Sequence, residues 1–160
     1  MARDTHRYLI ALGSNMRVPG IGGPRAVVGK AFAALEEKGL TLLATSRIVD
    51  SRPVGPSQRF YANAVALVET GLEPPALLGA LQGIETSFGR TRRGQRWRAR
   101  PLDLDIVLWS GGAWQSPGLA IPHPHFRERA FVLQPAARIA PGWRDPHTGL
   151  TLRQLAARGS

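Results

Sequence analysis

The amino-acid sequence predicts an α+β fold in which two helices cover one face of an antiparallel sheet. Strand-like and helix-like segments follow one another in the order β-α-β-β-α-β. Each of these helix-like segments carries one apolar stripe, and the last strand alternates apolar and polar residues. The chain has 160 residues, 43% hydrophobic and 20% charged, which is enough to bury one core. We therefore expect a single domain over residues 1–160.

The first half of the chain supplies one helix and three strands. Residues 6–14 predict a strand that ends at a Gly-Ser-Asn turn. Residues 23–39 predict a helix with a proline in its first turn and a glycine at its end. Residues 40–51 and 61–70 predict two further strands, joined by a loop that two prolines stiffen.

The second half adds a helix, a strand and a helical end. Residues 73–89 predict a helix, and residues 99–109 predict the fourth strand. A Ser-Gly-Gly turn after it indicates a further short strand, and residues 127–141 and 149–158 have helical patterns. The β-α-β-β-α-β order is typical of a ferredoxin-like sandwich, an antiparallel sheet with helices on one face. We therefore predict this α+β fold with extra C-terminal helices.

Charge and composition restrict the partners and the compartment. The net charge is +10, with nineteen arginines against two lysines, and six of the arginines lie within residues 90–100. Because the guanidinium fork suits phosphate oxygens, we expect a polyanionic partner: a nucleotide, a nucleic acid or an anionic surface. There is no cysteine, no apolar run long enough to span a bilayer and no signal-peptide pattern at the start. These features favour a cytoplasmic protein without a membrane partner.

Two carboxylates share one face of the strand at 99–109. Asp103 and Asp105 lie two residues apart, and Val107 and Trp109 continue their face. The opposite, apolar face comprises Leu102, Leu104, Ile106 and Leu108. Carboxylates on Cα atoms about 6.5 Å apart can together hold one or two Mg²⁺ ions, and the alternative is a solvated pair. The neighbouring arginines favour metal ligands, because like charges repel unless a cation lies between them.

The arginine-rich segment 90–100 admits three interpretations. It can clamp a triphosphate, contact a nucleic acid or form a solvated basic turn. Gly94 suits a loop that closes over a nucleotide, and Trp97 can stack on a base or anchor the loop. RNA-recognition modules on this fold need an aromatic strand motif that no strand here matches.

The segment 121–126, IPHPHF, contains His123 and His125. A zinc site would need further ligands, and nothing at motif spacing supplies them. With Arg127 and Arg129 close by, the segment is better interpreted as a second phosphate contact, the alternative being a proline-stiffened surface loop.

Polar residues on the other elements suggest recognition of a small molecule. Asn63 interrupts an apolar strand, and its amide offers a donor and an acceptor to the edge of a heterocycle. Tyr61 lies two residues earlier on the same face and can stack on the same ring. Gln82 and Glu85 lie three residues apart on the second predicted helix and so fall near one another. Exposed polar residues on a helix are usually only solvated, so this pair alone indicates little.

Together these segments resemble the 6-hydroxymethyl-7,8-dihydropterin pyrophosphokinase family over nearly the whole chain. The most specific part is the R-x-x-D-[LIV]-D pattern from Arg100 to Asp105, combined with the Pro-His-Pro segment. The matching stretches are ALGSN, SRPVGP, YANAVALVET, LQGIETSFGR, RWRARPLDLDIVLW and IPHPHFRERAFVL.

The resemblance implies a ferredoxin-like enzyme that transfers the β,γ-pyrophosphoryl group of ATP to the pterin and releases AMP. It implies that Asp103 and Asp105 bind two Mg²⁺ ions and that Arg92 acts catalytically on a mobile loop. The implied pterin-binding residues are Ser51, Val54, Tyr61, Asn63 and Phe131. The implied ATP-binding residues are Gln82, Glu85, Arg90, Arg92, Trp97, Arg100, His123 and Arg129.

Two other functions stay open at the level of sequence. One is a different two-metal nucleotide-transfer enzyme that releases pyrophosphate, and the other is an arginine-rich RNA-binding module. The resemblance favours small-molecule substrates, ATP and the pterin, a monomer, and no nucleic-acid or membrane partner.

Overall fold

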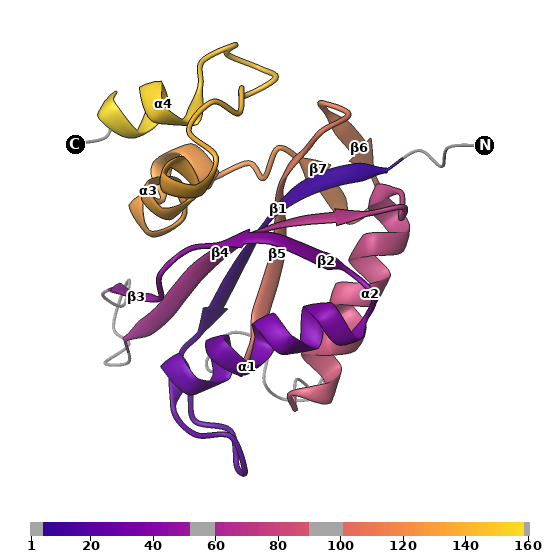
Figure 1. Ribbon diagram of the computed structural model, residues 1–160, viewed down its shortest axis with the longest axis vertical. Coiled ribbons are helices and arrows are strands. Elements are labelled where there is room, and N and C mark those ends of the chain that lie inside the picture. Colours follow the sequence, from indigo (N-terminus) through magenta and orange to yellow (C-terminus); the bar gives the residue numbers. More distant parts are fainter. Residues whose placement is uncertain (1–4, 52–59, 90–100, 159–160) are drawn as a thin grey trace.

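The computed structural model describes residues 5–51, 60–89 and 101–158. Three layers are visible in Figure 1: two helices, a central sheet and two C-terminal helices. The elements in chain order are β1 (His6–Ser14), α1 (Pro24–Glu37), β2 (Thr41–Thr45), β3 (Val49–Ser51), β4 (Tyr61–Thr70), α2 (Pro74–Ser87), β5 (Asp103–Trp109), β6 (Trp114–Ser116), β7 (Leu119–Ile121), the 3₁₀ turn η1 (Phe126–Glu128), α3 (Ala130–Ile139) and α4 (Leu152–Arg158).

The sheet confirms the predicted ferredoxin-like topology. Its strands lie in the order β2-β4-β1-β5, β3 also pairs with β4, and every pairing is antiparallel. The predicted short strand after Trp109 is confirmed as well, since β6 pairs with β7 in a separate hairpin.

The single strand predicted over residues 40–51 is wrong, because the chain forms β2 and β3 with a break between them. At the break, the Ser46 backbone N–H donates to the Val65 carbonyl over 2.8 Å. The Val65 N–H in turn donates to the Ser46 hydroxyl over 2.8 Å. A side-chain oxygen thus takes the place of a backbone carbonyl, and the regular ladder stops there.

Helices cover both faces of the sheet, whereas the sequence predicted helices on one face. Helices α1 and α2 lie on one side, and α3 and α4 lie on the other (Figure 1). Tyr8, Ile10 and Leu12 of β1 belong to the core under α1 and α2. Leu9 belongs to the second core, with residues of α3 and α4. Within the ranges that the structure describes, no helix is long and apolar enough to cross a membrane.

A bulge in β5 reverses the predicted alternation at its C-terminal end. Ile10 pairs with Ile106 but Leu9 pairs with Leu108, so Val107 is an extra residue against β1. Leu108 consequently packs in the second core rather than beside Ile106, and Trp109 packs against the first core. The predicted faces are right up to Ile106 and wrong for Leu108 and Trp109. Both aspartates lie before the bulge and keep the face that the sequence predicts.

Candidate active site

Three residues form a row across the middle of the sheet. Gly13 of β1 lies opposite Asn63 of β4 on one side and opposite Asp103 of β5 on the other. Because neighbouring strands are about 4.8 Å apart, the backbones of Asn63 and Asp103 are separated by about 10 Å. A Cβ atom added at Gly13 would lie 3.2 Å from the Oδ1 atom of Asn63. The missing side chain at Gly13 therefore leaves room between the amide and the carboxylate.

The second carboxylate lies on the same face, one step along β5. Asp105 is opposite Ala11, which is opposite Val65 on the other side. Val65 is buried in the second core and Ala11 packs against it, so this face is the one that α3 and α4 cover in part. Asp103 is partly buried, and the Asp105 side chain is 46% exposed. Both carboxylates are therefore partly exposed on this face of the sheet and accessible to a ligand.

His123 is fixed beside Asp105 by its own backbone and by its ring. Its N–H donates to the Val107 carbonyl over 3.0 Å, and its Nδ1 accepts the His125 N–H over 3.1 Å. The proton of the neutral ring is then on Nε2, which lies 4.0 Å from Oδ2 of Asp105. Burial lowers the pKa of His123, and the positive charge of Arg129 adds to this, although Asp105 acts in the opposite direction. His123 therefore presents a neutral N–H donor next to the carboxylate.

Glu85 connects α2 to the strand that carries the carboxylates. Its side chain is 7% exposed, and Oε2 accepts the Leu104 N–H over 2.8 Å. Leu104 lies between the two aspartates, so this bond fixes the backbone on which they stand. Gln82, one turn earlier, is exposed. The two residues therefore do not form a solvated pair on the helix surface. Gln82 is exposed to solvent, whereas Glu85 is buried.

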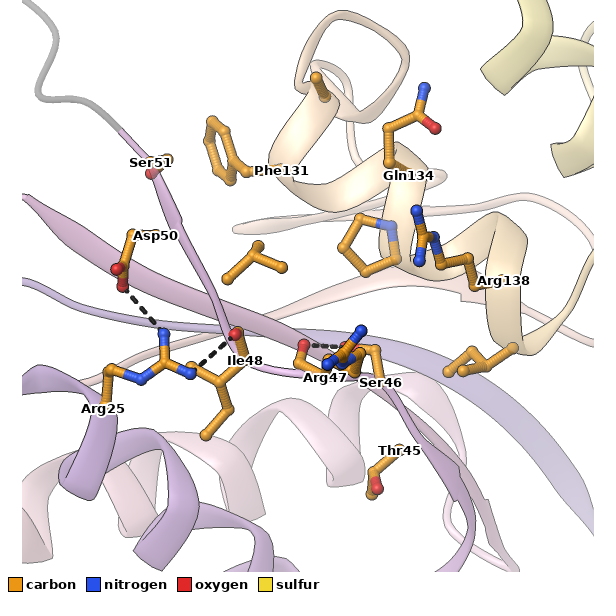
Figure 2. Close-up of a pocket in the computed structure, with 14 residues that line it drawn as sticks. Arg25, Thr45, Ser46, Arg47, Ile48, Asp50, Ser51, Phe131, Gln134 and Arg138 are labelled. Carbon is orange, nitrogen blue, oxygen red and sulfur yellow. Dashed lines mark hydrogen bonds and ion pairs between the residues drawn. The ribbon is translucent and has the colours of Figure 1, made fainter.

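The predicted pterin-binding residues lie along β3, β4 and the start of α3. Asn63 is buried, and its Nδ2 donates to the Ser51 hydroxyl over 2.7 Å. Tyr61 pairs with Ser51 across β3 and β4. Phe131 lies with Ser51 on the lining of one cavity (Figure 2), and the Arg129 Cζ atom is 6.0 Å from the centre of the Phe131 ring.

The structure thus brings most of the described candidates together in two groups, one around Asn63 and one around Asp105. Gln82 is exposed on α2, and its carbonyl accepts the Thr86 hydroxyl of the same helix. Asp103 connects the groups through the row at Gly13. The other predicted site residues lie outside the described ranges: Val54, Arg90, Arg92, Trp97 and Arg100.

Arg127 does not face the carboxylates of β5, in contrast to the phosphate contact expected from its position. Its Nε and Nη2 atoms donate to Asp145 over 2.6 and 2.7 Å. Asp145 is fully buried and also accepts the His147 N–H and the Thr148 hydroxyl. This pair connects η1 to the segment between α3 and α4, so the arginine stabilises the second core.

Sequence reasoning missed Gly13, although a signal was available. A glycine inside a strand pattern often indicates a close approach by a ligand or another group. The Asn63 side chain approaches at this glycine.

The two carboxylates offer hard oxygen donors of the kind that Mg²⁺ prefers. In the part of the chain that the structure describes, no three or more His, Cys, Asp or Glu side chains gather as a metal cluster. A metal ion held by Asp103 and Asp105 would therefore take further oxygens from a substrate or from water, which is how Mg²⁺ is usually bound beside phosphates. The donor set fits this ion.

Comparison with known proteins finds relatives of one family. Residues 9–141 match the family model for 7,8-dihydro-6-hydroxymethylpterin-pyrophosphokinase. A Pseudomonas aeruginosa protein named 2-amino-4-hydroxy-6-hydroxymethyldihydropteridine pyrophosphokinase is 43% identical over 153 residues, covering 94% of this chain and 90% of that protein. A protein of the same name from Synechocystis sp. is 37% identical over 157 residues, covering 96% of this chain and 76% of the relative.

The fold is also found in a solved structure of a longer protein. The crystal structure of wild-type Plasmodium falciparum HPPK-DHPS with pteroate matches 99% of this chain with a TM-score of 0.73. This chain covers 43% of that protein at 14% identity, a likeness that concerns the fold alone. The family model and the relatives at 37% and 43% identity lead to one conclusion: the chain belongs to the 7,8-dihydro-6-hydroxymethylpterin-pyrophosphokinase family.

Proposed function

We propose that this chain transfers pyrophosphate from ATP to 6-hydroxymethyl-7,8-dihydropterin, giving AMP and the pterin diphosphate for folate synthesis. The observation that carries the proposal is the row of Asn63, Gly13 and Asp103 across the sheet. It puts an amide suited to a heterocycle and a carboxylate suited to a metal–phosphate complex on one face of the sheet, with their backbones about 10 Å apart.

The chemical step forms one bond and breaks one. The hydroxymethyl oxygen of the pterin attacks the β-phosphorus of ATP, its proton leaves, and the bond between the α-phosphate and the β-phosphorus breaks to release AMP. Such transfers depend on positioning and on charge neutralisation more than on covalent catalysis. The strand residues are proposed to supply the positioning, and the arginines of the segment 90–100 to supply positive charge.

Asp103 and Asp105 are the proposed ligands of two Mg²⁺ ions. When bound, the ions neutralise charge on the triphosphate oxygens. The antiparallel pairing of β5 with β1 and the Glu85–Leu104 hydrogen bond hold the two carboxylates on one face before any ligand binds. Carboxylates fixed in advance do not lose conformational freedom when the complex forms.

Asn63 and Ser51 are the proposed polar contacts of the pterin, and the rings of Tyr61 and Phe131 are proposed to lie on its two faces. Val54, outside the described residues, is a further proposed contact. The Asn63–Ser51 hydrogen bond supports this assignment, because it orients the amide and leaves Oδ1 directed toward the gap at Gly13. A buried amide with an oriented acceptor can discriminate between heterocycles by their donor pattern.

One of the proposed ATP-binding residues lies beside the second carboxylate, Asp105. His123 offers its Nε2–H next to Asp105, and Arg129 adds positive charge near the same ring. Arg92 is the proposed catalytic arginine, which offsets charge on the reacting phosphates. The complete proposed set is Gln82, Glu85, Arg90, Arg92, Trp97, Arg100, His123 and Arg129.

A product assay tests the proposal. Purified protein is incubated with ATP, Mg²⁺ and 6-hydroxymethyl-7,8-dihydropterin, and the nucleotides are resolved by chromatography. We expect AMP to form only when the pterin is present. Formation of ADP would indicate transfer of one phosphoryl group, and release of pyrophosphate would indicate nucleotidyl transfer. Absence of any nucleotide product from folded protein would favour the RNA-binding alternative.

We also propose that residues 1–160 act as one domain, as a monomer, in the cytoplasm. Light scattering coupled to size-exclusion chromatography tests the oligomeric state, with the expected mass of one 17.3 kDa chain. A mass of twice that value would contradict it.

A further inference from the structure

A cavity of about 790 Å³ lies between the β2–β3 edge of the sheet and α3 (Figure 2). One end lies at Ser51 and Phe131, both predicted pterin contacts. From there it extends along α3 to Arg47 and Arg138 (Figure 2). We call this extension the α3 groove and define it by Arg47, Val49, Gln134, Pro135, Arg138 and Ile139.

Two arginines at the far end of the α3 groove have no carboxylate partner among the residues that the structure describes. Arg25, a third lining arginine, donates to Asp50 over 3.2 Å and to the Ile48 carbonyl over 3.1 Å. Among the described lining residues, Asp50 is the single carboxylate, and it forms its ion pair with Arg25. Within the described ranges, neither Arg47 nor Arg138 forms an ion pair through its guanidinium. The far end of the groove is therefore electropositive.

The two guanidiniums come from different elements. Arg47 belongs to the segment between β2 and β3, where the strand ladder breaks at Ser46, and Arg138 belongs to the last turn of α3. The position of Arg138 also complements the negative end of the helix dipole. That explanation does not extend to Arg47, whose side chain is exposed on the rim of the same cavity.

The walls between the ends are apolar. Val49, Pro135 and Ile139 line the groove, and the Phe131 ring lies at its near end. Phe131 and Arg138 are seven residues apart on α3, which corresponds to about 10 Å along the helix. A ligand that used both ends would need an apolar body of about this length and a negative group at one tip.

We propose that the α3 groove binds a small organic anion, with a flat apolar body against Phe131 and Pro135 and a carboxylate or phosphate between Arg47 and Arg138. Arginine forks form strong charge-assisted hydrogen bonds with either anion. The site does not depend on the proposed reaction. One consequence does rest on the proposed function: because the groove opens into the end of the cavity that Ser51 and Phe131 line, we expect an occupant whose ring lies against Phe131 to compete with the pterin.

Fluorescence titration tests the site with 8-anilinonaphthalene-1-sulfonate, whose sulfonate stands in for the anionic group. The variants are Arg47→Ala/Arg138→Ala and a control with the same loss of charge, Arg153→Ala/Arg158→Ala on α4. We expect saturable one-to-one binding to the wild type and the control, and at least about tenfold weaker binding to the groove variant. Thermal unfolding verifies that all three proteins are folded.

An uncharged probe separates the arginine contribution from general apolar binding. N-phenyl-1-naphthylamine has the same rings without the sulfonate, and we expect it to bind the wild type and the groove variant equally. Displacement of the sulfonate probe by 1-naphthoate or by 1-naphthyl phosphate then distinguishes a carboxylate ligand from a phosphate ligand.

Two outcomes would overturn the proposal. One is equal affinity of the sulfonate probe for all three proteins, particularly if ATP displaces it, since the probe would then occupy the nucleotide site. The other is the absence of saturable binding to the folded wild type. Without the probe, we expect the groove variant to form AMP at the wild-type rate. Probe binding therefore tests the groove, and AMP formation tests the proposed reaction, independently of each other.

Discussion

Residues of three different strands lie side by side at the predicted active site. Gly13 separates Asn63 from Asp103, and the alternation of β5 puts Asp105 on the same face. The proposed function gives these residues different tasks, so single substitutions are expected to affect different steps. Three predictions follow at this scale, for the carboxylates, the amide and the glycine.

Replacing Asp103 or Asp105 by alanine is expected to lower the rate of AMP formation at least about a hundredfold, because each substitution removes a proposed ligand of the metal–triphosphate complex. The fold is expected to survive, since both side chains are accessible to solvent. Steady-state kinetics and circular dichroism measure the two effects. Glu36→Ala, which removes an exposed carboxylate from α1, is the control. Near-normal activity of both aspartate variants would rule out the metal assignment.

Replacing Asn63 by alanine is expected to weaken pterin binding by about 1–3 kcal/mol while leaving ATP binding within a few tenths. The substitution removes an oriented donor and acceptor and leaves the Ser51 hydroxyl without its partner. Calorimetric titration with each ligand measures both affinities. Ser51→Ala, which removes the other half of the same hydrogen bond, is expected to have a smaller effect of the same kind. Equal weakening of both ligands by Asn63→Ala would contradict the assignment.

Gly13→Ala is expected to weaken pterin binding without unfolding the protein. The added Cβ would lie 3.2 Å from Oδ1 of Asn63, which forces the amide to shift by a few tenths of an ångström. Calorimetry measures the loss of affinity. Gly29→Ala on α1 is the control, because nothing lies within 4 Å of its added Cβ, and it is expected to stabilise the helix. Unchanged pterin affinity in Gly13→Ala would show that the space beside the Asn63 amide at Gly13 is not needed for pterin binding.

At the scale of elements, the C-terminal helices are attached through a buried ion pair rather than through apolar contacts alone. Arg127 of η1 donates two hydrogen bonds to Asp145, which the chain buries between α3 and α4. Burial by itself raises the pKa of Asp145, but the hydrogen bonds from Arg127, His147 and Thr148 hold it at about 2. The ionised carboxylate is thus the form that the folded protein stabilises.

This pair predicts a specific pH dependence of stability. The folded pKa of Asp145 lies below its ordinary value of 3.8, so its contribution is complete above about pH 4 and is lost as the pH falls toward about 2. The loss amounts to about 2 kcal/mol. Urea unfolding between these pH values measures it, and Asp145→Asn is expected to remove that component of the pH dependence. Asp50→Asn, at an exposed pair, is the control. The same slope in wild type and Asp145→Asn would contradict this account.

At the scale of the whole molecule, helices on both faces decide which part of the sheet stays open. Helices α3 and α4 cover the face that also carries Asn63, Asp103 and Asp105, and they leave the carboxylates partly exposed (Figure 1). The same packing forms the cavity beside α3. The site and the α3 groove therefore both depend on how the C-terminal helices dock.

The sequence predicts the local features well because they depend on near neighbours in the chain. The order of the core strands and helices and the shared face of Asp103 and Asp105 follow from periodicity, and the structure confirms both. The family resemblance, confirmed by the comparisons, was carried by short motifs of the same kind. The break at Ser46 and the bulge at Val107 were missed, because each depends on a partner strand distant in sequence.

The sequence by itself therefore determined the fold class, the family and the shared face of Asp103 and Asp105 on one strand. These depend on residue type and on spacing within one element, where a period of two or of 3.6 residues fixes the face. Only the tertiary structure decided that Gly13 separates Asn63 from Asp103, that Arg127 pairs with Asp145, and that α3 lies along a cationic groove. Strand register and helix docking bring together residues that are far apart in sequence, and no local pattern encodes those contacts.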